Sequence, residues 1–205
     1  MNQFINEYGD SLRRFWDKAT TESEKEKLHT NILAYANNNP HQFTTELKEV
    51  LFDTDLDPLS VVLEALSKDT DTWGDFFVEI LGKIFNAAYA TDKADEILFN
   101  LTEFYYVEDD TRPFVQKIVN KLQTELSSTR TDIRLAAIRN IISFLNNPSI
   151  RNKTAIINQL TGMLNDPDWK VRYVTFQYLG FENLLPNGAK LGLADRLKKM
   201  IFGQP

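Results

Sequence analysis

The stretch LTGMLNDPDWKVRYVTFQYL at residues 160–179 decides the fold, because LQTELSSTRTDIRLAAIRNI at residues 122–141 follows the same template 38 residues earlier. Apolar positions and one arginine correspond at this offset: Leu126 with Leu164, Ile133 with Val171, Arg134 with Arg172, and Ile141 with Leu179. Self-similarity at a period of about 20–50 residues marks repeat proteins, in which each unit buries its apolar face against a neighbour. The sequence therefore predicts a fold that presents an extended binding surface, without naming the partner.

The composition is that of a soluble globular protein, with 25% charged and 42% apolar residues in a chain of 205. The absence of cysteine excludes disulfides, thiolate nucleophiles and cysteine-ligated zinc, and it fits a reducing cytosol. The N-terminus lacks a basic segment followed by an apolar core, and no apolar run approaches the roughly 18 residues of a membrane span. We therefore expect a cytoplasmic protein that neither enters a membrane nor is secreted.

Apolar residues at i, i+3 and i+4 and sparse helix-stopping Gly and Pro predict an all-α chain. The expected helices span about 3–18, 22–37, 41–52, 58–68, 72–90, 93–107, 113–126, 132–145, 152–164, 169–181 and 190–202. Short loops make sequential helices antiparallel hairpins. We therefore expect one domain over residues 1–205, a short right-handed α-solenoid of about five helix pairs with degenerate repeats in 1–110.

The last expected helix carries an apolar stripe and a basic opposite face; the stripe comprises Leu193, Leu197, Met200 and Ile201. Because a terminal repeat needs one polar side, we interpret this helix as a cap that covers the end of the stack. The segment 97–107 is apolar nearly all round, which places it in the middle of the stack.

Residues 164–179 resemble the second half of a HEAT repeat, whose pattern is L-x-D-P-D-x-x-V-R followed by small and apolar residues. The matching positions are Leu164, Asp166, Pro167, Asp168, Val171, Arg172 and Leu179. The preceding unit matches at Leu126, Ile133, Arg134, Ala137 and Ile141, with Ser128 and Thr129 in place of Asp-Pro. The resemblance covers about residues 113–181. It implies an armadillo-like α-solenoid that binds other proteins, with Asp166 and Arg172 in a structural ladder between neighbouring units.

Charge is divided between the two halves of the sequence. Residues 1–110 hold 9 Lys and Arg against 23 Asp and Glu, a formal charge of −14, whereas residues 111–205 hold 14 against 6, a charge of +8. The asymmetry has two interpretations: solvated helix faces whose signs drifted apart, or a basic half that binds an acidic partner. The candidate contact residues are Arg130, Arg134, Arg139, Arg151, Lys153, Trp169, Lys170 and Tyr173.

Few residues suggest chemistry. Asp53, Asp55, Asp57 and Glu64 occupy positions 1, 3, 5 and 12 of a calcium-binding loop, but Pro58 stands where that loop needs glycine, so we expect a helix cap. His29 and His41, the two histidines, lack clustered acidic or histidine partners, and we expect surface or turn positions for both. Motifs for nucleotide binding, serine hydrolysis and zinc proteolysis are missing. The sequence predicts no catalytic, cofactor or metal residue.

The leading hypothesis is therefore a non-catalytic protein-interaction module, with self-association as one version of it. A second hypothesis involves nucleic acid, through direct binding by the basic face or through an acidic half that acts like a small bacterial immunity protein. An enzyme resembling the HEAT-like DNA glycosylases is disfavoured. Trp169, Tyr173 and Phe176 do lie among basic residues, but a pI near 5.0 and the acidic first half do not suit a fold that wraps DNA.

Overall fold

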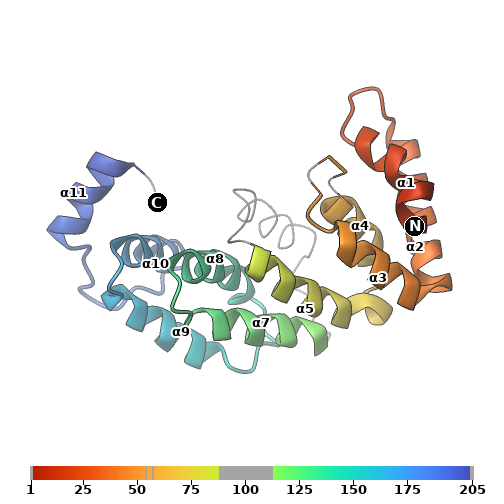
Figure 1. The fold of residues 1–205 in the computed structure, drawn as a ribbon. Coiled ribbons are helices and arrows are strands. Elements are labelled where there is room, and N and C mark those ends of the chain that lie inside the picture. The colour runs from red at the N-terminus through yellow and green to blue at the C-terminus, as the bar shows by residue number, and fades with distance from the viewer. Residues whose placement is uncertain (1, 54, 57, 88–112, 204–205) are drawn as a thin grey trace. The chain divides into compact units, whose positions relative to one another are not determined.

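The computed structural model describes residues 2–53, 55–56, 58–87 and 113–203, except for the side chains of residues 84–87 (Figure 1). These residues form α-helices and two short 3-10 helices, and no strand occurs among them. The predicted all-α class is confirmed. The expected helix at 93–107 and the expected cap Asp57 lie outside the described residues. The chain divides into two compact units at Phe77 and Val78, inside helix α5, and each unit is described by itself.

Unit 1 holds four helices and the start of a fifth. They are α1 (Gln3–Arg14), α2 (Glu22–Asn38), α3 (Pro40–Val50), α4 (Pro58–Ser67) and α5 (Thr70–Ala87). Helix α2 contacts both α3 and α4, and α3 contacts α1. The most buried of these helices is α4, in which eight of ten residues are buried, whereas α2 buries one face.

Local signals set several helix boundaries in unit 1. Thr21 and Glu24 form a capping box, in which the Thr21 hydroxyl accepts from the Glu24 amide and the Glu24 carboxylate accepts from the Thr21 amide. Pro40 and Pro58 begin α3 and α4, as proline favours the first helical turn. Helix α1 ends at Arg14, before the expected residue 18, because the Thr20 hydroxyl donates to the Arg14 carbonyl at 2.6 Å.

The core of unit 1 is built from aromatic side chains. The ring of Phe4 lies 5.5 Å from that of Phe43, edge to face, and 5.3 Å from that of Tyr8. Phe43 also meets Trp73 of α5 at 5.5 Å. Edge-to-face pairs at these distances add to the stabilisation from burial. The aromatic cluster therefore joins α1, α3 and α5.

One carboxylate is buried within this cluster. Glu46 of α3 accepts from the backbone amides of Gln3 and Phe4 at 3.0 and 2.9 Å, and from the Tyr35 hydroxyl at 3.0 Å. A negative charge at the first amides of α1 satisfies donors that have no partner within the helix. Glu46 thus fixes the N-terminus of α1 on α3.

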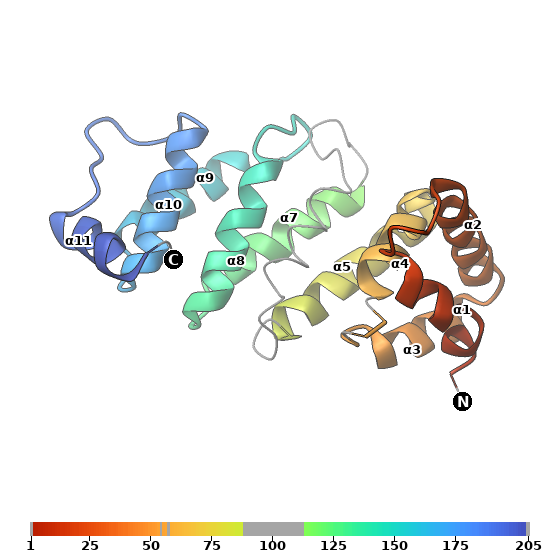
Figure 2. The same ribbon diagram turned by 90° about the horizontal axis from the view of Figure 1, so that it is seen from above.

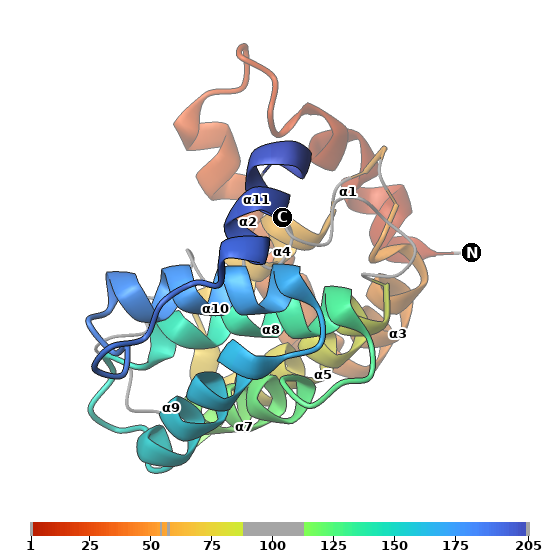
Figure 3. The ribbon, with the colours of Figure 1, turned by 90° about the vertical axis from the view of Figure 1, so that its left-hand side faces the viewer.

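Unit 2 begins with the C-terminal part of α5 and contains two consecutive helix pairs. The first pair is α7 (Pro113–Glu125) and α8 (Thr131–Ile141), which continues as the 3-10 turn η1 (Ile142–Phe144). The second pair is α9 (Lys153–Gly162), with the 3-10 turn η2 (Met163–Asn165), and α10 (Trp169–Phe181). Figure 3 shows α8 and α10 side by side in one layer, and α7 and α9 in the other. Two antiparallel hairpins stacked in register are the unit of an α-solenoid, as the sequence predicts.

The second helix of each hairpin, α8 or α10, buries side chains at corresponding positions. Ile133, Ala137 and Ile141 of α8 correspond to Val171, Thr175 and Leu179 of α10, and all six side chains are buried. Residues at i, i+4 and i+8 share one helix face, which here packs into the hairpin. The 38-residue template is therefore a template of core positions.

Amide side chains join the first helices, α7 and α9. Gln116 Nε2 donates to Asn152 Oδ1 at 2.8 Å, the Asn152 amide donates to Asn120 and Gln123, and Gln159 donates to Ser127 at 2.9 Å. The two hairpins are thus held together by apolar packing between α8 and α10 and by polar contacts between α7 and α9.

Candidate functional site

An ion pair links the two helix pairs of unit 2. Arg134 of α8 donates from Nε and Nη2 to the two carboxylate oxygens of Asp166, in the turn before α10, at 2.9 Å each. Its Nη1 donates to the Ser128 carbonyl at 2.9 Å. Both side chains are about nine-tenths buried. A bidentate pair of this kind fixes direction as well as distance, so it sets the register of one hairpin on the next.

The same arrangement recurs one repeat later. Arg172 of α10 donates from Nε and Nη2 to Asp195 at 2.7 and 2.5 Å, and from Nη1 to the Asp166 carbonyl at 2.5 Å. In both cases the backbone acceptor lies six residues before the arginine. Asp195 stands in the first turn of α11 (Leu193–Phe202), which therefore occupies the position of a next repeat on the stack (Figure 2). The hydrogen bonds from the Arg172 guanidinium lower the pKa of Asp195. Burial acts to raise this pKa, but its effect is smaller.

Comparison with known proteins agrees with this geometry. Residues 156–181, which span most of α9 and all of α10, match the family model of the HEAT repeat. This segment is similar to a HEAT repeat. No curated protein and no solved structure matches the chain significantly. HEAT repeats form helical scaffolds for protein interaction, so the match supports a role of that general kind and leaves the partner open.

The HEAT repeat geometry separates the predicted contact residues into buried and exposed ones. Arg134 and Tyr173 are buried, with residue exposures of 8% and 6%. Arg134 holds Asp166, and the Tyr173 ring lies under the Lys199 ammonium at 5.7 Å. Trp169 is half-buried, with its ring 6.4 Å from that of Phe202. These three side chains pack within unit 2 and are therefore excluded as contact residues. Five of the predicted contact residues remain: Arg130, Arg139, Arg151, Lys153 and Lys170.

The remaining cations fall at opposite ends of the hairpins. We call the end with residues 126–130 and 166–168 the turn end, and the end with residues 145–152 the loop end. The turn end holds Arg130 and Lys170, whereas the loop end holds Arg139, Arg151 and Lys153. Contacts across each end fix the assignment, because Thr131 donates to Asp168 and Asn146 donates to Glu182. The structure therefore divides the predicted surface into two groups.

The two ends differ in charge. The turn end is nearly balanced, with five cations and four carboxylates: Lys121, Arg130, Arg134, Lys170 and Arg172 against Glu125, Asp132, Asp166 and Asp168. Among the described residues, the loop end has four cations and one carboxylate: Lys117, Arg139, Arg151 and Lys153 against Glu182. A further excess of positive charge lies between residues 190 and 199. This segment holds four cations, Lys190, Arg196, Lys198 and Lys199, and one carboxylate, Asp195. Among residues 113–203, the positive charge is therefore concentrated at the loop end and in the α11 segment.

Helix α11 is oriented differently from the expected cap. Its apolar side chains are solvent-exposed: Leu193 by 74%, Leu197 by 48%, Met200 by 79%, Ile201 by 72% and Phe202 by 70%. The face that contacts α10 carries Asp195 and Lys199, with the Phe202 ring 6.4 Å from that of Trp169 at its end. The reason is the Arg172–Asp195 pair, which turns this face towards α10. The interpretation of this helix as a cap is therefore wrong, because a cap would bury the apolar stripe, whereas the stripe of α11 is exposed to solvent.

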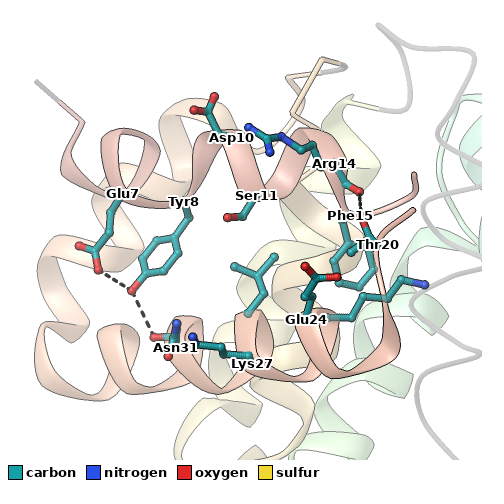
Figure 4. Close-up of a pocket in the computed structure, with 12 residues that line it drawn as sticks. Glu7, Tyr8, Asp10, Ser11, Arg14, Phe15, Thr20, Glu24, Lys27 and Asn31 are labelled. Carbon is teal, nitrogen blue, oxygen red and sulfur yellow. Dashed lines mark hydrogen bonds between the residues drawn. The ribbon is translucent and has the colours of Figure 1, made fainter. Parts of the chain in front are cut away.

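Unit 1 contains a cavity of about 460 Å³ between α1 and α2 (Figure 4). Its carboxylates already have local partners: Glu7 accepts from the Tyr8 hydroxyl at 2.8 Å, Asp10 pairs with Arg13, and Glu24 belongs to the capping box. Burial, followed by the contact with Glu7, raises the pKa of Tyr8. These interactions lie within α1 and at the N-terminus of α2, and we derive no reaction from them.

His29 differs from its predicted surface position, because it is buried, with 2% exposure. Its Nε2 has no hydrogen-bond partner among the described residues and lies 3.6 Å from Glu64 Oε2, beside a cavity of about 300 Å³. Burial lowers the pKa of His29, against the opposing effect of Glu64. The spacing of His29 with Ile32 and Ala36 places all three on one helix face, a signal of burial that the search for ligand partners missed. His41 is exposed at the start of α3.

The acidic segment after α3 has a structural role in the part of it that is described. Asp53 Oδ1 accepts from the amides of Asp55 and Leu56 at 2.9 and 3.1 Å, which closes a turn. No group of three or more His, Asp or Glu side chains that could hold a metal occurs among the described residues. None of the helices that the structure describes combines the length and apolar character needed to cross a membrane.

Proposed function

We propose that the chain is a non-catalytic protein-binding module whose loop end binds an acidic surface of a partner protein. The observation that carries the proposal is the match of residues 156–181 to the HEAT repeat together with the cations of the loop end, which outnumber carboxylates four to one among the described residues. Arg151 is exposed and Lys153 is half-buried at the start of α9, whereas Arg139 is half-buried on α8. A cluster of like charge on a rigid helical scaffold attracts an oppositely charged surface and accelerates association with it.

The ion pairs of unit 2 support this choice of surface. Each of the six carboxylates in residues 113–203 already accepts a hydrogen bond or ion pair within the unit: Glu125, Asp132, Asp166, Asp168, Glu182 and Asp195. Residues 113–203 hold 13 Lys and Arg against these six carboxylates, so this segment is formally positive. An acidic surface on a partner protein complements that charge.

Affinity capture tests the proposal with two charge reversals of equal size. Immobilised chain is incubated with nuclease-treated lysate at low salt, and the retained proteins are identified and quantified by mass spectrometry. The double variant Arg151→Glu and Lys153→Glu changes the loop end, and the matched variant Arg130→Glu and Lys170→Glu changes the turn end. We expect a defined acidic protein that the loop-end variant loses and the turn-end variant retains. Equal retention by all three forms would contradict the proposal.

Nucleic acid is the alternative partner of the same cations. Fluorescent duplex DNA and single-stranded RNA, added to the purified chain, distinguish it from a protein partner. Binding to phosphate backbones falls linearly in log–log plots against salt and shows little sequence preference. Submicromolar nucleic-acid binding that the loop-end variant abolishes, with no protein retained, would assign the loop end to nucleic acid instead.

A further inference from the structure

Exposed apolar side chains are concentrated on α11. Seven large apolar side chains are exposed among the described residues, and five of them lie on this helix: Leu193, Leu197, Met200, Ile201 and Phe202. The other two are Phe181, at the end of α10, and Trp16 in unit 1. Contiguous exposed apolar surface on a soluble protein marks a binding site more often than isolated apolar residues do.

The apolar stripe occupies one side of α11, and polar side chains border it. Successive residues of an α-helix are about 100° apart, so Leu193, Leu197, Met200 and Ile201 share one side, and Asp195 and Lys199 lie on the opposite side. The Arg172–Asp195 pair and the Lys199–Tyr173 contact hold that opposite side on α10. Arg196 and Lys198, both exposed, flank the stripe on its two edges.

We propose that this face docks an amphipathic helix of a partner protein whose apolar side is flanked by acidic residues. The docked helix would lie against α11 and cover its stripe. The position of α11 supports this occupant, because Asp195 continues the ladder that begins at Asp166. The stack is thereby extended by one helix whose outer face none of the described residues covers. A helix laid into such an apolar face is a common mode of recognition, with anchors at i, i+3, i+4 and i+7.

Charge selects this occupant over a second copy of the chain. Two copies of α11 packed stripe to stripe would bring Arg196 and Lys198 against each other in either direction, and like charges at an interface oppose association. The described surface of unit 1 is acidic but offers Trp16 as its one exposed large apolar side chain. Acidic residues on the partner helix would instead pair with both edges of the stripe.

The docking face is separate from the loop end, so this proposal goes beyond the proposed function and is tested independently of it. The probes are two synthetic helical peptides with leucine at i, i+3, i+4 and i+7, one with glutamate and one with lysine at the flanking positions. Fluorescence anisotropy of the labelled peptides with the full chain measures the affinity of each. We expect the glutamate peptide to bind at least about tenfold more tightly than the lysine peptide.

Three variants locate the binding. Leu197→Ser with Ile201→Ser should weaken the glutamate peptide about tenfold, while Trp16→Ser, which removes an exposed apolar residue of unit 1, should leave it unchanged. Arg196→Glu with Lys198→Glu should reverse the preference between the two peptides. This reversal is informative even if the serine variant perturbs the helix, because a gain of binding to the lysine peptide requires an intact face.

Equal affinity for the two peptides, or equal weakening by Trp16→Ser, would overturn the proposal. Sedimentation with phosphatidylserine vesicles that depends on Leu197 and Ile201, without peptide binding, would assign the face to a lipid surface and also overturn it. A dimer in light scattering that the serine variant dissociates would assign the face to a second copy, which contradicts the proposal in the same way.

Discussion

Arg172 and Asp195 form a two-point ion pair that repeats the geometry of Arg134 and Asp166. In each pair the guanidinium also donates to a backbone carbonyl six residues upstream. The repetition means that α11 is attached to the HEAT repeat by the same contact that attaches the repeat to its predecessor. Arg134 and Arg172 therefore have a structural role, and we do not count them among the cations that bind a partner.

The first prediction concerns the buried pair. Asp166→Asn leaves the Arg134 guanidinium buried without its counter-charge, and we expect a loss of about 3 kcal/mol in the free energy of unfolding. Asp132→Asn makes the same chemical change in a pair that is about half exposed, and it should cost less than about 1 kcal/mol. Urea titration followed by circular dichroism measures both. Equal costs would mean that the ladder adds no more than a surface pair.

The second prediction concerns Glu46. Replacement with glutamine places an amide donor against the amides of Gln3 and Phe4, and we expect a loss of about 2 kcal/mol. Glu49→Gln, an exposed position on the same helix, is the matched control and should change stability by less than about 0.5 kcal/mol. The measurement is urea unfolding near pH 7. A cost for Glu46→Gln no larger than that for Glu49→Gln would show that the cap of α1 contributes little.

The same carboxylate predicts a pH dependence. Burial acts to raise the pKa of Glu46, but hydrogen bonds from Gln42, Gln3, Phe4 and Tyr35 outweigh it and lower the pKa. A carboxylate with a lowered folded pKa stabilises the fold above its unfolded pKa, and this contribution is lost as pH falls through the folded value. The wild type should therefore lose stability below about pH 4.5 more steeply than Glu46→Gln. Parallel stability curves in this range would contradict the assignment.

His29 predicts a second loss of stability towards low pH, which begins at a higher pH than that of Glu46. Its pKa is lowered by burial, so the folded state resists protonation, and stability should fall as pH drops below the unfolded value of about 6.5. His29→Phe removes the titrating group and the unpartnered Nε2, and it should flatten the melting temperature between about pH 5 and 6.5. His41→Phe at the exposed start of α3 is the control and should keep the wild-type slope. A slope that survives in His29→Phe would assign it to other groups.

The sequence predicts the structural features that recur from one hairpin to the next. The 38-residue offset finds Arg134 with Arg172 and the buried stripes of α8 and α10, because core positions recur with the hairpin. Asp195 follows Asp166 by 29 residues and so falls outside the period, which is why the ladder to α11 could not be foreseen. The outward stripe of α11 has the same origin, since amphipathicity defines a face but not the direction in which it points.

Other features depend on contacts between distant residues. Glu46 lies with Phe43 and Leu47 on a buried helix face, so its burial was visible in the pattern, but its hydrogen bonds to α1 were not. The predicted basic surface mixes residues from two ends of the hairpins, because linear spacing does not show which helix ends meet. The expectation of a single domain over residues 1–205 stays a prediction.

The central claim is that the loop end of unit 2 binds an acidic protein surface. Its most direct test is the dissociation constant of the partner identified by capture, measured at about 50 and 300 mM salt for the wild type and both charge-reversal variants. We predict that salt weakens wild-type binding, that Arg151→Glu with Lys153→Glu weakens it at least about tenfold at low salt, and that Arg130→Glu with Lys170→Glu leaves it within about twofold. A salt-independent affinity, or an equal loss in the two variants, would contradict the claim.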